Sequence, residues 1–346
     1  MKNFINISDC SSVELRAIIE EAKKRKQNRS GLNKSAPDKD KPFEGRSMAM
    51  IFEKPSTRTR MSFDIAVKQL GGSSIILNPD GIHYGKGDET LKDTAKVLSE
   101  YVDIVMLRTS SHKNLEEFGK HLDIPIINGL SDVSHPCQIM SDILTYEESN
   151  GSIEGKTVSW IGDGNNNMSN SLIEAAGKFN FQLRIGCPKK YSPNKSILKL
   201  AKRDRVKLTI TPKPIEAATG ADCVMTDKWI SMNDKVNKAV KKKILKPYQV
   251  NKKLMNKASS NAIFMHCLPV GRGEEVTDDD GVREAGAHAA GARERGRVGM
   301  ATVARAPQKK KKRSGCREKK SVGSRHEEDG DVGDPGGALA VHLLPD

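Results

Sequence analysis

Short apolar runs alternate with helix-like stretches along most of this 346-residue chain. In the helix-like stretches, apolar residues recur every three or four positions, which is the spacing of one helix face. Strands that alternate with helices form parallel sheets covered by helices on both faces. The expected strands are Met48–Phe52, Ser74–Leu77, Ile104–Leu107, Pro125–Ile127, Thr157–Ile161, Gln182–Ile185, Lys207–Ile210, Cys223–Met225 and Ala262–Met265. The expected helices between them are Arg60–Leu70, Leu91–Tyr101, Leu115–Leu122, Gln138–Glu148, Met168–Phe179 and Ser196–Arg203.

A turn-rich stretch, Ser149–Ser152, interrupts this alternation near the middle of the chain. The length is enough for two domains of ordinary size. We therefore predict an α/β fold with two domains, each a parallel β-sheet flanked by helices. The first domain is expected over residues 1–149 and the second over residues 150–277.

The composition changes abruptly near residue 264. No Phe, Tyr, Trp or Ile follows Phe264, and no Asn follows Asn261. From Gly281 onward Gly, Ala, Arg, Val and Asp dominate, so this stretch has little apolar surface to bury. We therefore predict a disordered tail over residues 278–346. It is either a solvated functional tail or a foreign or frame-shifted C-terminus, and the abruptness of the change favours the second.

The formal net charge of +14 suits anionic ligands, including phosphates, nucleic acid and anionic membranes. The basic run Lys309–Arg313 lacks neighbouring aromatic residues, and residues 278–346 hold 14 Lys and Arg against 12 Asp and Glu, which argues against nucleic acid. No run of about 18 apolar residues is present, so no membrane span is expected. Most lysines are interpreted as solvated helix faces. An example is the set that flanks an apolar stripe of Val236, Val240 and Ile244, namely Lys235, Lys238, Lys241, Lys242 and Lys246.

The N-terminal stretch and the cysteines both favour a cytoplasmic protein. Residues 1–26 contain no apolar leader segment, and Val13, Leu15, Ile18 and Ile19 instead predict an amphipathic helix. The six cysteines show neither metal-ligand spacing nor a paired framework, so we expect reduced thiols. We predict no metal ion and no cofactor.

An anion site is predicted where the first strand meets its helix. Ser56, Thr57, Arg58, Thr59 and Arg60 follow the strand directly. A helix N-terminus offers free N–H groups and the positive end of the helix dipole. The hydroxyl groups add donors, and the guanidinium of Arg58 matches a phosphate in shape and charge.

This Ser-Thr-Arg-Thr-Arg segment resembles the carbamoyl phosphate loop of the aspartate/ornithine carbamoyltransferase family. Two further segments agree in order and spacing, Leu107–Thr109 at a strand end and His135–Gln138 at a helix start. The resemblance covers residues 3–277. It implies that Arg108, His135 and Gln138 contact the carbamoyl group, where preorganised donors stabilise a developing oxyanion.

Segments of the second half resemble the ornithine-binding members of that family. Asp227, Ser231 and Met232 stand in a Thr-Asp-Lys-Trp-Ile-Ser-Met segment, and Cys267 and Leu268 stand in a His-Cys-Leu-Pro segment that the aspartate enzymes lack. The resemblance implies that Asp227 accepts the α-ammonium group of the acceptor and that Cys267 lies near the reacting δ-amine and, with Asp227, favours its neutral, nucleophilic form. It also implies that Cys267 and Leu268 contact the carbamoyl phosphate. Asn167 is expected to hold the polar backbone atoms of the amino acid, with Asn166 as the alternative.

Two segments depart from the family pattern. The loop His83–Glu89 contains no glutamine where the family usually places one against carbamoyl phosphate, so His83 or Lys86 is the candidate substitute. In the family this loop serves the neighbouring subunit, which implies a homotrimer. The family also ends in a helix whose arginine reaches the active site, and no matching segment follows Asp278.

The resemblance therefore implies transfer of the carbamoyl group of carbamoyl phosphate to the side-chain amine of L-ornithine, a step of arginine biosynthesis. Direct attack by the substrate amine, with proximity and oxyanion stabilisation, requires no covalent intermediate. Two alternatives stay open. One is an inactive homologue that retains carbamoyl phosphate binding, and the other is a transferase for a related amine such as putrescine.

Overall fold

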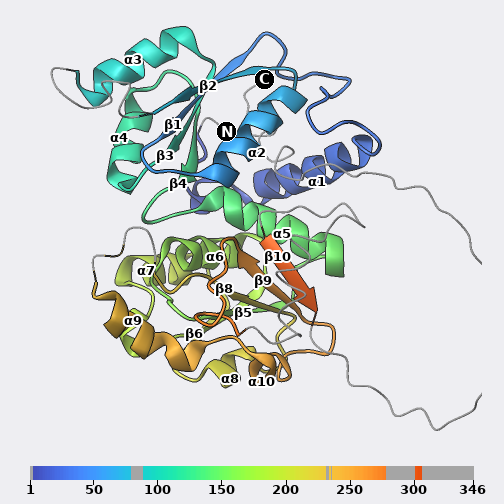
Figure 1. Ribbon diagram of the computed structural model, residues 1–346, viewed down its shortest axis with the longest axis vertical. Coiled ribbons are helices and arrows are strands. Elements are labelled where there is room, and N and C mark those ends of the chain that lie inside the picture. Colours follow the sequence, from blue (N-terminus) through green and yellow to red (C-terminus); the bar gives the residue numbers. More distant parts are fainter. Residues whose placement is uncertain (1–2, 79–88, 231–233, 235, 278–300, 306–346) are drawn as a thin grey trace, which may run out of the picture.

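The first domain is built on a four-stranded parallel sheet in the order β2-β1-β3-β4 (Figure 1). The computed structural model describes residues 3–78, 89–230, 234, 236–277 and the backbone of 301–305. The strands are β1 (Ser47–Phe52), β2 (Ser73–Leu77), β3 (Ile104–Arg108) and β4 (Ile126–Leu130). The side chains of β1 alternate between the two faces, with Met48, Met50 and Phe52 in one apolar cluster and Ala49 and Ile51 in another.

Helices cover both faces of this sheet, as expected for parallel strands. The cluster of Met48 and Met50 also holds residues of α1 (Ser12–Asn28), α2 (Thr57–Gln69) and α5 (Pro136–Asn150). The cluster of Ala49 and Ile51 holds residues of α3 (Leu91–Tyr101) and α4 (His112–His121). A short helix, η1 (Ile7–Asp9), precedes α1.

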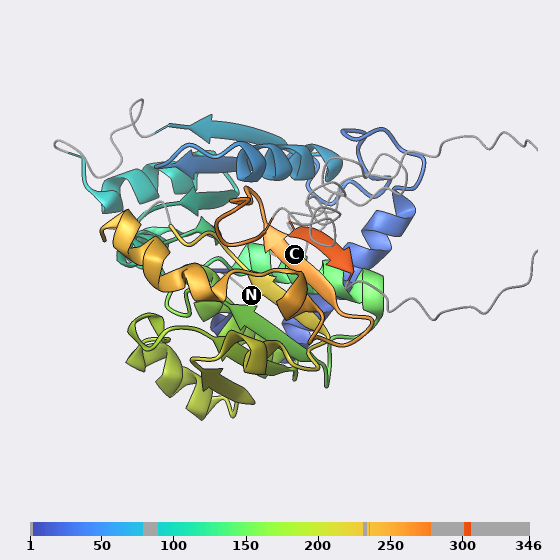
Figure 2. The ribbon, with the colours of Figure 1, turned by 60° about the horizontal axis from the view of Figure 1, so that its bottom comes forward.

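The second domain contains a six-stranded sheet in the order β10-β9-β8-β5-β6-β7. Its parallel strands are β5 (Thr157–Ile161), β6 (Gln182–Gly186), β7 (Leu208–Thr211), β8 (Cys223–Thr226) and β9 (Ile263–Cys267). The edge strand β10 (Ala301–Arg305) pairs antiparallel with β9, and Figure 2 shows the two side by side. The covering helices are α6 (Asn167–Lys178), η3 (Lys189–Tyr191), α7 (Lys195–Arg203), α8 (Pro214–Ala218), α9 (Lys238–Leu245), η4 (Lys246–Tyr248) and α10 (Lys252–Met255).

Helix α5 lies between the two sheets and belongs to the core of both (Figure 1). Eleven of its fifteen residues are buried, among them the polar Gln138 and Asp142. One apolar cluster runs from β1 through Ile139 and Ile143 to Trp160 on β5. The candidate residues on α5 are therefore fixed in position by packing against both domains.

The fold class predicted from the sequence is confirmed, and all nine expected strands form within two or three residues of their expected ends. The interpretation of Lys241 as a solvated lysine is wrong. Lys241 is 3% exposed, whereas Val236 and Val240 are 43% and 49% exposed, so α9 turns a different face to the sheet. Most of the expected tail lies outside the described residues, but Ala301–Arg305 departs from the expectation of disorder by forming β10.

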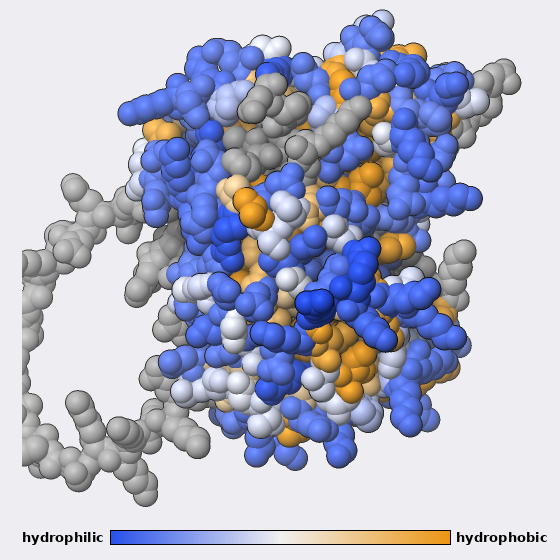
Figure 3. Space-filling view, turned by 180° about the vertical axis from the view of Figure 1, so that it is seen from behind, coloured by the Kyte–Doolittle hydropathy of each residue, from blue (hydrophilic) through white to orange (hydrophobic). Residues whose placement is uncertain are grey.

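Polar residues predominate on the face shown in Figure 3, and apolar residues form small patches on it. The large exposed apolar side chains are spread over several elements, for example Val13 on α1, Val97 and Tyr101 on α3, and Val240 on α9. Within the described ranges, no helix is long and apolar enough to cross a membrane.

Candidate functional site

The candidate residues lie at the carboxyl ends of strands in both sheets. In the first domain, the loop after β1 leads to Ser56, Arg108 ends β3, and the loop after β4 leads to His135. In the second domain, Asp227 follows β8 and Cys267 ends β9. Ligands of open α/β sheets bind at this edge. A hydrogen bond of 2.5 Å from Nη2 of Arg58 to the carbonyl oxygen of Leu268 connects the two halves.

The N-terminus of α2 presents unused hydrogen-bond donors. Ser56 is the N-cap residue, but its side chain caps no backbone N–H group, and the first turn of α2 contains no acidic residue. Thr57 and Arg58 are exposed, whereas Thr59 is buried. This end of α2 therefore carries the positive end of the helix dipole and the exposed guanidinium of Arg58, both of which favour an anion.

Arg108 lies beside this helix end and is only 8% exposed. Its Nη1 donates to the hydroxyl of Thr59 at 3.0 Å, and its Nε has no hydrogen-bond partner among the described residues. Burial and the neighbouring charge of Arg58 lower the pKa of Arg108 to about 10, so it remains charged at neutral pH. A cation held near another cation is stabilised by an anion between them.

Glu53 orients the backbone that follows Arg108, a role that the sequence analysis did not identify. Its Oε2 accepts hydrogen bonds from the hydroxyl of Thr109 at 2.7 Å and from the N–H of Ser110 at 3.1 Å. Glu53 follows β1 directly and Thr109 follows β3 directly, and these strands are neighbours in the sheet. The adjacency of their carboxyl ends was the available signal.

His135 is a buried, neutral imidazole. It is the N-cap of α5, and its backbone N–H donates to the hydroxyl of Ser171 at 2.9 Å. Burial and the charge of Arg108 lower the pKa of His135 to about 3. Its Nδ1 has no partner within the described part of the chain. The ring can therefore exchange a hydrogen bond with a ligand without becoming charged.

The amide of Gln138 is oriented by Asp142, which the sequence analysis also missed. Nε2 of Gln138 donates to Oδ1 of Asp142 at 2.9 Å, and both side chains are at least 96% buried. Burial raises the pKa of Asp142 to about 7, with a smaller contribution from Asp227. The two residues stand four positions apart on α5, so they share one face of the helix, and this spacing was the signal for the pair.

Asn167 is the first residue of α6 and lies against the loop after β4. Its Nδ2 donates to the carbonyl oxygen of Ser131 at 2.8 Å. The alternative candidate, Asn166, is the N-cap of α6 and accepts from the N–H of Ser169 at 2.8 Å. Because this cap uses the side chain of Asn166, Asn167 is the better placed of the two.

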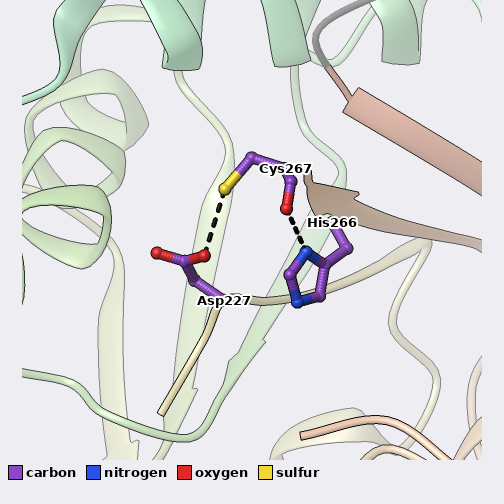
Figure 4. Close-up of side chains that lie close together, drawn as sticks. All are labelled: Asp227, His266 and Cys267. Carbon is purple, nitrogen blue, oxygen red and sulfur yellow. Dashed lines mark hydrogen bonds between the residues drawn. The ribbon is translucent and has the colours of Figure 1, made fainter. Parts of the chain in front are cut away.

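Asp227 and Cys267 contact each other at the ends of two neighbouring strands (Figure 4). Sγ of Cys267 donates to Oδ1 of Asp227 at 3.1 Å. Burial and the carboxylates of Asp227 and Asp142 raise the pKa of Cys267 well above its usual value, so it is a thiol. The predicted ornithine contacts Ser231 and Met232, and the loop residues His83 and Lys86, lie outside the described residues.

Asp227, His266 and Cys267 are also a set that a metal ion could use. Their ligand atoms lie within 4.8 Å of one another. The ring of His266, however, is already oriented by protein groups. Its Nδ1 contacts the carbonyl oxygen of Cys267 (Figure 4), and its Nε2 lies 3.2 Å from Oε1 of Glu275. The sequence-based expectation of a site without metal stays a prediction.

Comparison with known proteins identifies the family. Residues 2–148 match the carbamoyl-P binding domain of aspartate/ornithine carbamoyltransferases, and residues 154–303 match the Asp/Orn binding domain of the same family. The chain belongs to the aspartate/ornithine carbamoyltransferase family and is a carbamoyltransferase.

Its relatives within the family include ornithine carbamoyltransferases. That of Brucella ovis is 48% identical over 279 residues, which cover 81% of this chain and 87% of the relative. That of Ruegeria pomeroyi is 46% identical over 280 residues, covering 81% and 90%. The solved structure of the Pyrococcus furiosus enzyme has a TM-score of 0.74 at 39% identity, covering 81% of this chain and 88% of that one.

Proposed function

We propose that the chain transfers the carbamoyl group of carbamoyl phosphate to the side-chain amine of L-ornithine, yielding L-citrulline and phosphate. The observation that carries this proposal is the approach of two sets of groups from different domains. Arg58, Arg108 and His135 come from the first domain, Asp227 and Cys267 come from the second, and the bond from Arg58 to Leu268 connects them. The names of the relatives support ornithine as the acceptor.

The phosphate of the donor is assigned to the N-terminus of α2. Its ligands are the free N–H groups of the helix, the hydroxyls of Ser56, Thr57 and Thr59, and the guanidinium of Arg58. Arg108 lies beside this end, where its Nη1 donates to the hydroxyl of Thr59, and its charge would compensate the phosphate as it departs. The backbone at Leu268 lies beside the same donor because Arg58 reaches its carbonyl oxygen.

The carbamoyl group is assigned to Arg108, His135 and Gln138. As the C–N bond forms and the C–O bond to phosphate breaks, charge develops on the carbamoyl oxygen. Neutral His135 and charged Arg108 would stabilise that charge. Asp142 occupies an N–H of Gln138, which leaves the amide oxygen of Gln138 to accept from the carbamoyl nitrogen.

The amino acid is assigned to the second domain, over residues 150–277. The carboxylate of Asp227 would pair with its α-ammonium group, and Asn167 would bind its polar backbone atoms. Ser231 and Met232 are proposed contacts on sequence grounds. Cys267 contacts Asp227 as a neutral thiol. It therefore adds no negative charge that would favour the protonated form of the attacking amine.

The test is a citrulline assay on the purified chain with carbamoyl phosphate and L-ornithine. Putrescine and L-aspartate serve as competing acceptors. Turnover with ornithine alone supports the proposal, whereas turnover with putrescine identifies a different acceptor. Binding of carbamoyl phosphate without any turnover identifies an inactive homologue.

We also propose a cytoplasmic homotrimer whose first domain, residues 1–149, binds the donor. The support is the family membership together with the resemblance of the loop His83–Glu89 to one that serves a neighbouring subunit. Light scattering after size-exclusion chromatography measures the mass of the assembly. A fully active monomer would contradict this proposal.

A further inference from the structure

Lys241 on α9 is a buried cation between two carboxylates. Its side chain is 4% exposed, and its Nζ lies 2.6 Å from Oδ2 of Asp163 and 2.8 Å from Oδ2 of Asp234. Nζ also lies 5.2 Å from the ring centroid of Tyr191. Burial alone would lower the pKa of Lys241, but Asp163 and Asp234 together raise it, so the amine stays charged at neutral pH.

Asp163 belongs to the segment that runs from β5 to Asn167. Its Oδ1 accepts the N–H of Asn165 at 2.9 Å, and its carbonyl oxygen accepts the indole N–H of Trp160 at 2.9 Å. Gly164 allows the close packing of this segment, because a Cβ there would lie 2.9 Å from the carbonyl oxygen of Tyr191. The carboxylate of Asp163 thus fixes the segment internally and offers its second oxygen to Lys241.

Asp234 belongs to the segment that runs from Asp227 at the end of β8 to α9. The last residues of β8 and β5, from which the two segments start, are joined by a hydrogen bond of 2.6 Å from the hydroxyl of Thr226 to the carbonyl oxygen of Ile161. Beyond the strand ends, Lys241 makes a second connection, between Asp163 of one segment and Asp234 of the other. Two connections fix the separation and the relative orientation of the segments, which one alone would not.

We propose that Lys241 is a positioning residue for the acceptor, holding the segment with Asn167 and the segment with Asp227 at a fixed separation through Asp163 and Asp234. This inference rests on the proposed function, because it takes Asn167 and Asp227 as the ornithine contacts. Lys241 itself is not proposed to touch a substrate. Its removal would leave two neighbouring carboxylates without their shared cation, and their repulsion would separate the segments.

The experiment compares three substitutions on one helix in the full-length chain. Lys241→Met removes the charge, Lys241→Arg keeps it, and Lys243→Met is the matched control because Lys243 is exposed. We expect Lys241→Met to raise the KM for ornithine at least tenfold while the KM for carbamoyl phosphate changes less than twofold. Lys241→Arg should restore most of the loss, and Lys243→Met should match the parent chain. Equal changes in both KM values, or in neither, would overturn the proposal.

A second measurement does not depend on turnover. Amide hydrogen exchange of peptides covering residues 162–168 and 226–238 should rise in Lys241→Met and stay unchanged in Lys243→Met. Unchanged exchange in Lys241→Met would overturn the proposal even if the parent enzyme is active. If the parent chain makes no citrulline, the proposed function fails, and exchange still decides whether Lys241 connects the segments. If Lys241→Met does not fold, the double variant Lys241→Met/Asp163→Asn replaces it, because it leaves only one carboxylate without a cation. It should show the same rise in exchange over both peptides relative to the parent chain.

Discussion

At the scale of single residues, the donor end of the site depends on Arg58. Its guanidinium stands at the start of α2 and reaches the carbonyl oxygen of Leu268 in the other domain. Arg58→Ala should lose about 2 to 4 kcal/mol of transition-state stabilisation, the range for one buried charge-assisted contact. In kcat/KM for carbamoyl phosphate this is a decrease of roughly 30- to 1000-fold. Lys68→Ala, an exposed cation in the last turn of the same helix, is the control, and equal effects of both variants would contradict the assignment.

The acceptor end of the site depends in the same way on Asp227. Its carboxylate already accepts from the thiol of Cys267, and its other oxygen can pair with an α-ammonium group. Asp227→Asn should raise the KM for ornithine by about 10- to 100-fold, as expected for a lost charge-assisted bond, and change the KM for carbamoyl phosphate little. Steady-state kinetics with each substrate varied in turn measures both values. The exposed Asp123→Asn should behave as the parent chain, and a shared increase in both KM values would argue against this role.

At the scale of elements, burial makes one contact between α6 and η1 dependent on pH. Glu174 on α6 is 6% exposed, and its Oε2 accepts the N–H of Ser8 at 2.9 Å. Burial raises the pKa of Glu174 from its ordinary value of about 4.5 to about 7. Between these values the folded chain keeps a proton that the unfolded chain has lost. The contribution of Glu174 to stability is therefore fully present below pH 4.5 and is lost as the pH rises through 7.

Glu174→Gln should therefore stabilise the protein at pH 8 and not at pH 4.5. The neutral amide keeps an oxygen for the N–H of Ser8, and the gain at pH 8 is at most about 3 kcal/mol, since one pKa unit corresponds to about 1.4 kcal/mol. Thermal unfolding of both chains at the two pH values measures the difference. The exposed Glu154→Gln should show no such pH dependence, and an equal gain at both pH values would contradict the explanation.

Local patterns predicted the elements well and their exposed faces less well. The strand Thr157–Ile161 and the helix Leu91–Tyr101 form over the residues that periodicity indicates. Lys241 was misassigned because the apolar stripe of Val236 and Val240 faces solvent, while two carboxylates from distant segments neutralise the buried lysine. Such a partnership depends on tertiary contacts that helical spacing does not contain.

The candidate site was predictable where a motif combined with a strand end. Arg108, His135 and Cys267 all lie where the resemblance and the parallel sheets expect them, although their roles stay proposals. Asp142 was missed because a carboxylate inside a helix usually faces solvent. Only the burial of α5 between both sheets shows that it contacts Gln138. Glu53 was missed for a similar reason, since its partners lie on a neighbouring strand.

At the scale of the whole molecule, the last described strand connects the atypical C-terminal region to the site. The region from Gly281 onward has little apolar surface to bury, and on that ground alone its removal should change little. In the fold, β10 pairs with β9, and Ala301 and Thr302 stand opposite Cys267 and His266. Strand β10 thereby covers the edge of the strand that carries the proposed site residue, and an uncovered edge strand loses the hydrogen bonds that hold its backbone.

Two truncated chains distinguish an inert C-terminal region from one in which β10 stabilises β9. A chain that ends after Arg305 keeps β10 and should match the full-length protein in melting temperature and citrulline formation. A chain that ends after Thr277 lacks β10. It should be less stable by on the order of 2 kcal/mol, because several backbone hydrogen bonds are lost at about 0.5 to 1 kcal/mol each. For a protein of this size, that corresponds to a decrease of roughly 3 °C in melting temperature. Its rate of citrulline formation should fall by more than the loss of folded protein explains, because Cys267 lies at the end of β9 that β10 no longer pairs with. Identical melting curves and rates for both truncations would show that β10 contributes nothing and that the region after Thr277 is inert, as its composition alone suggests.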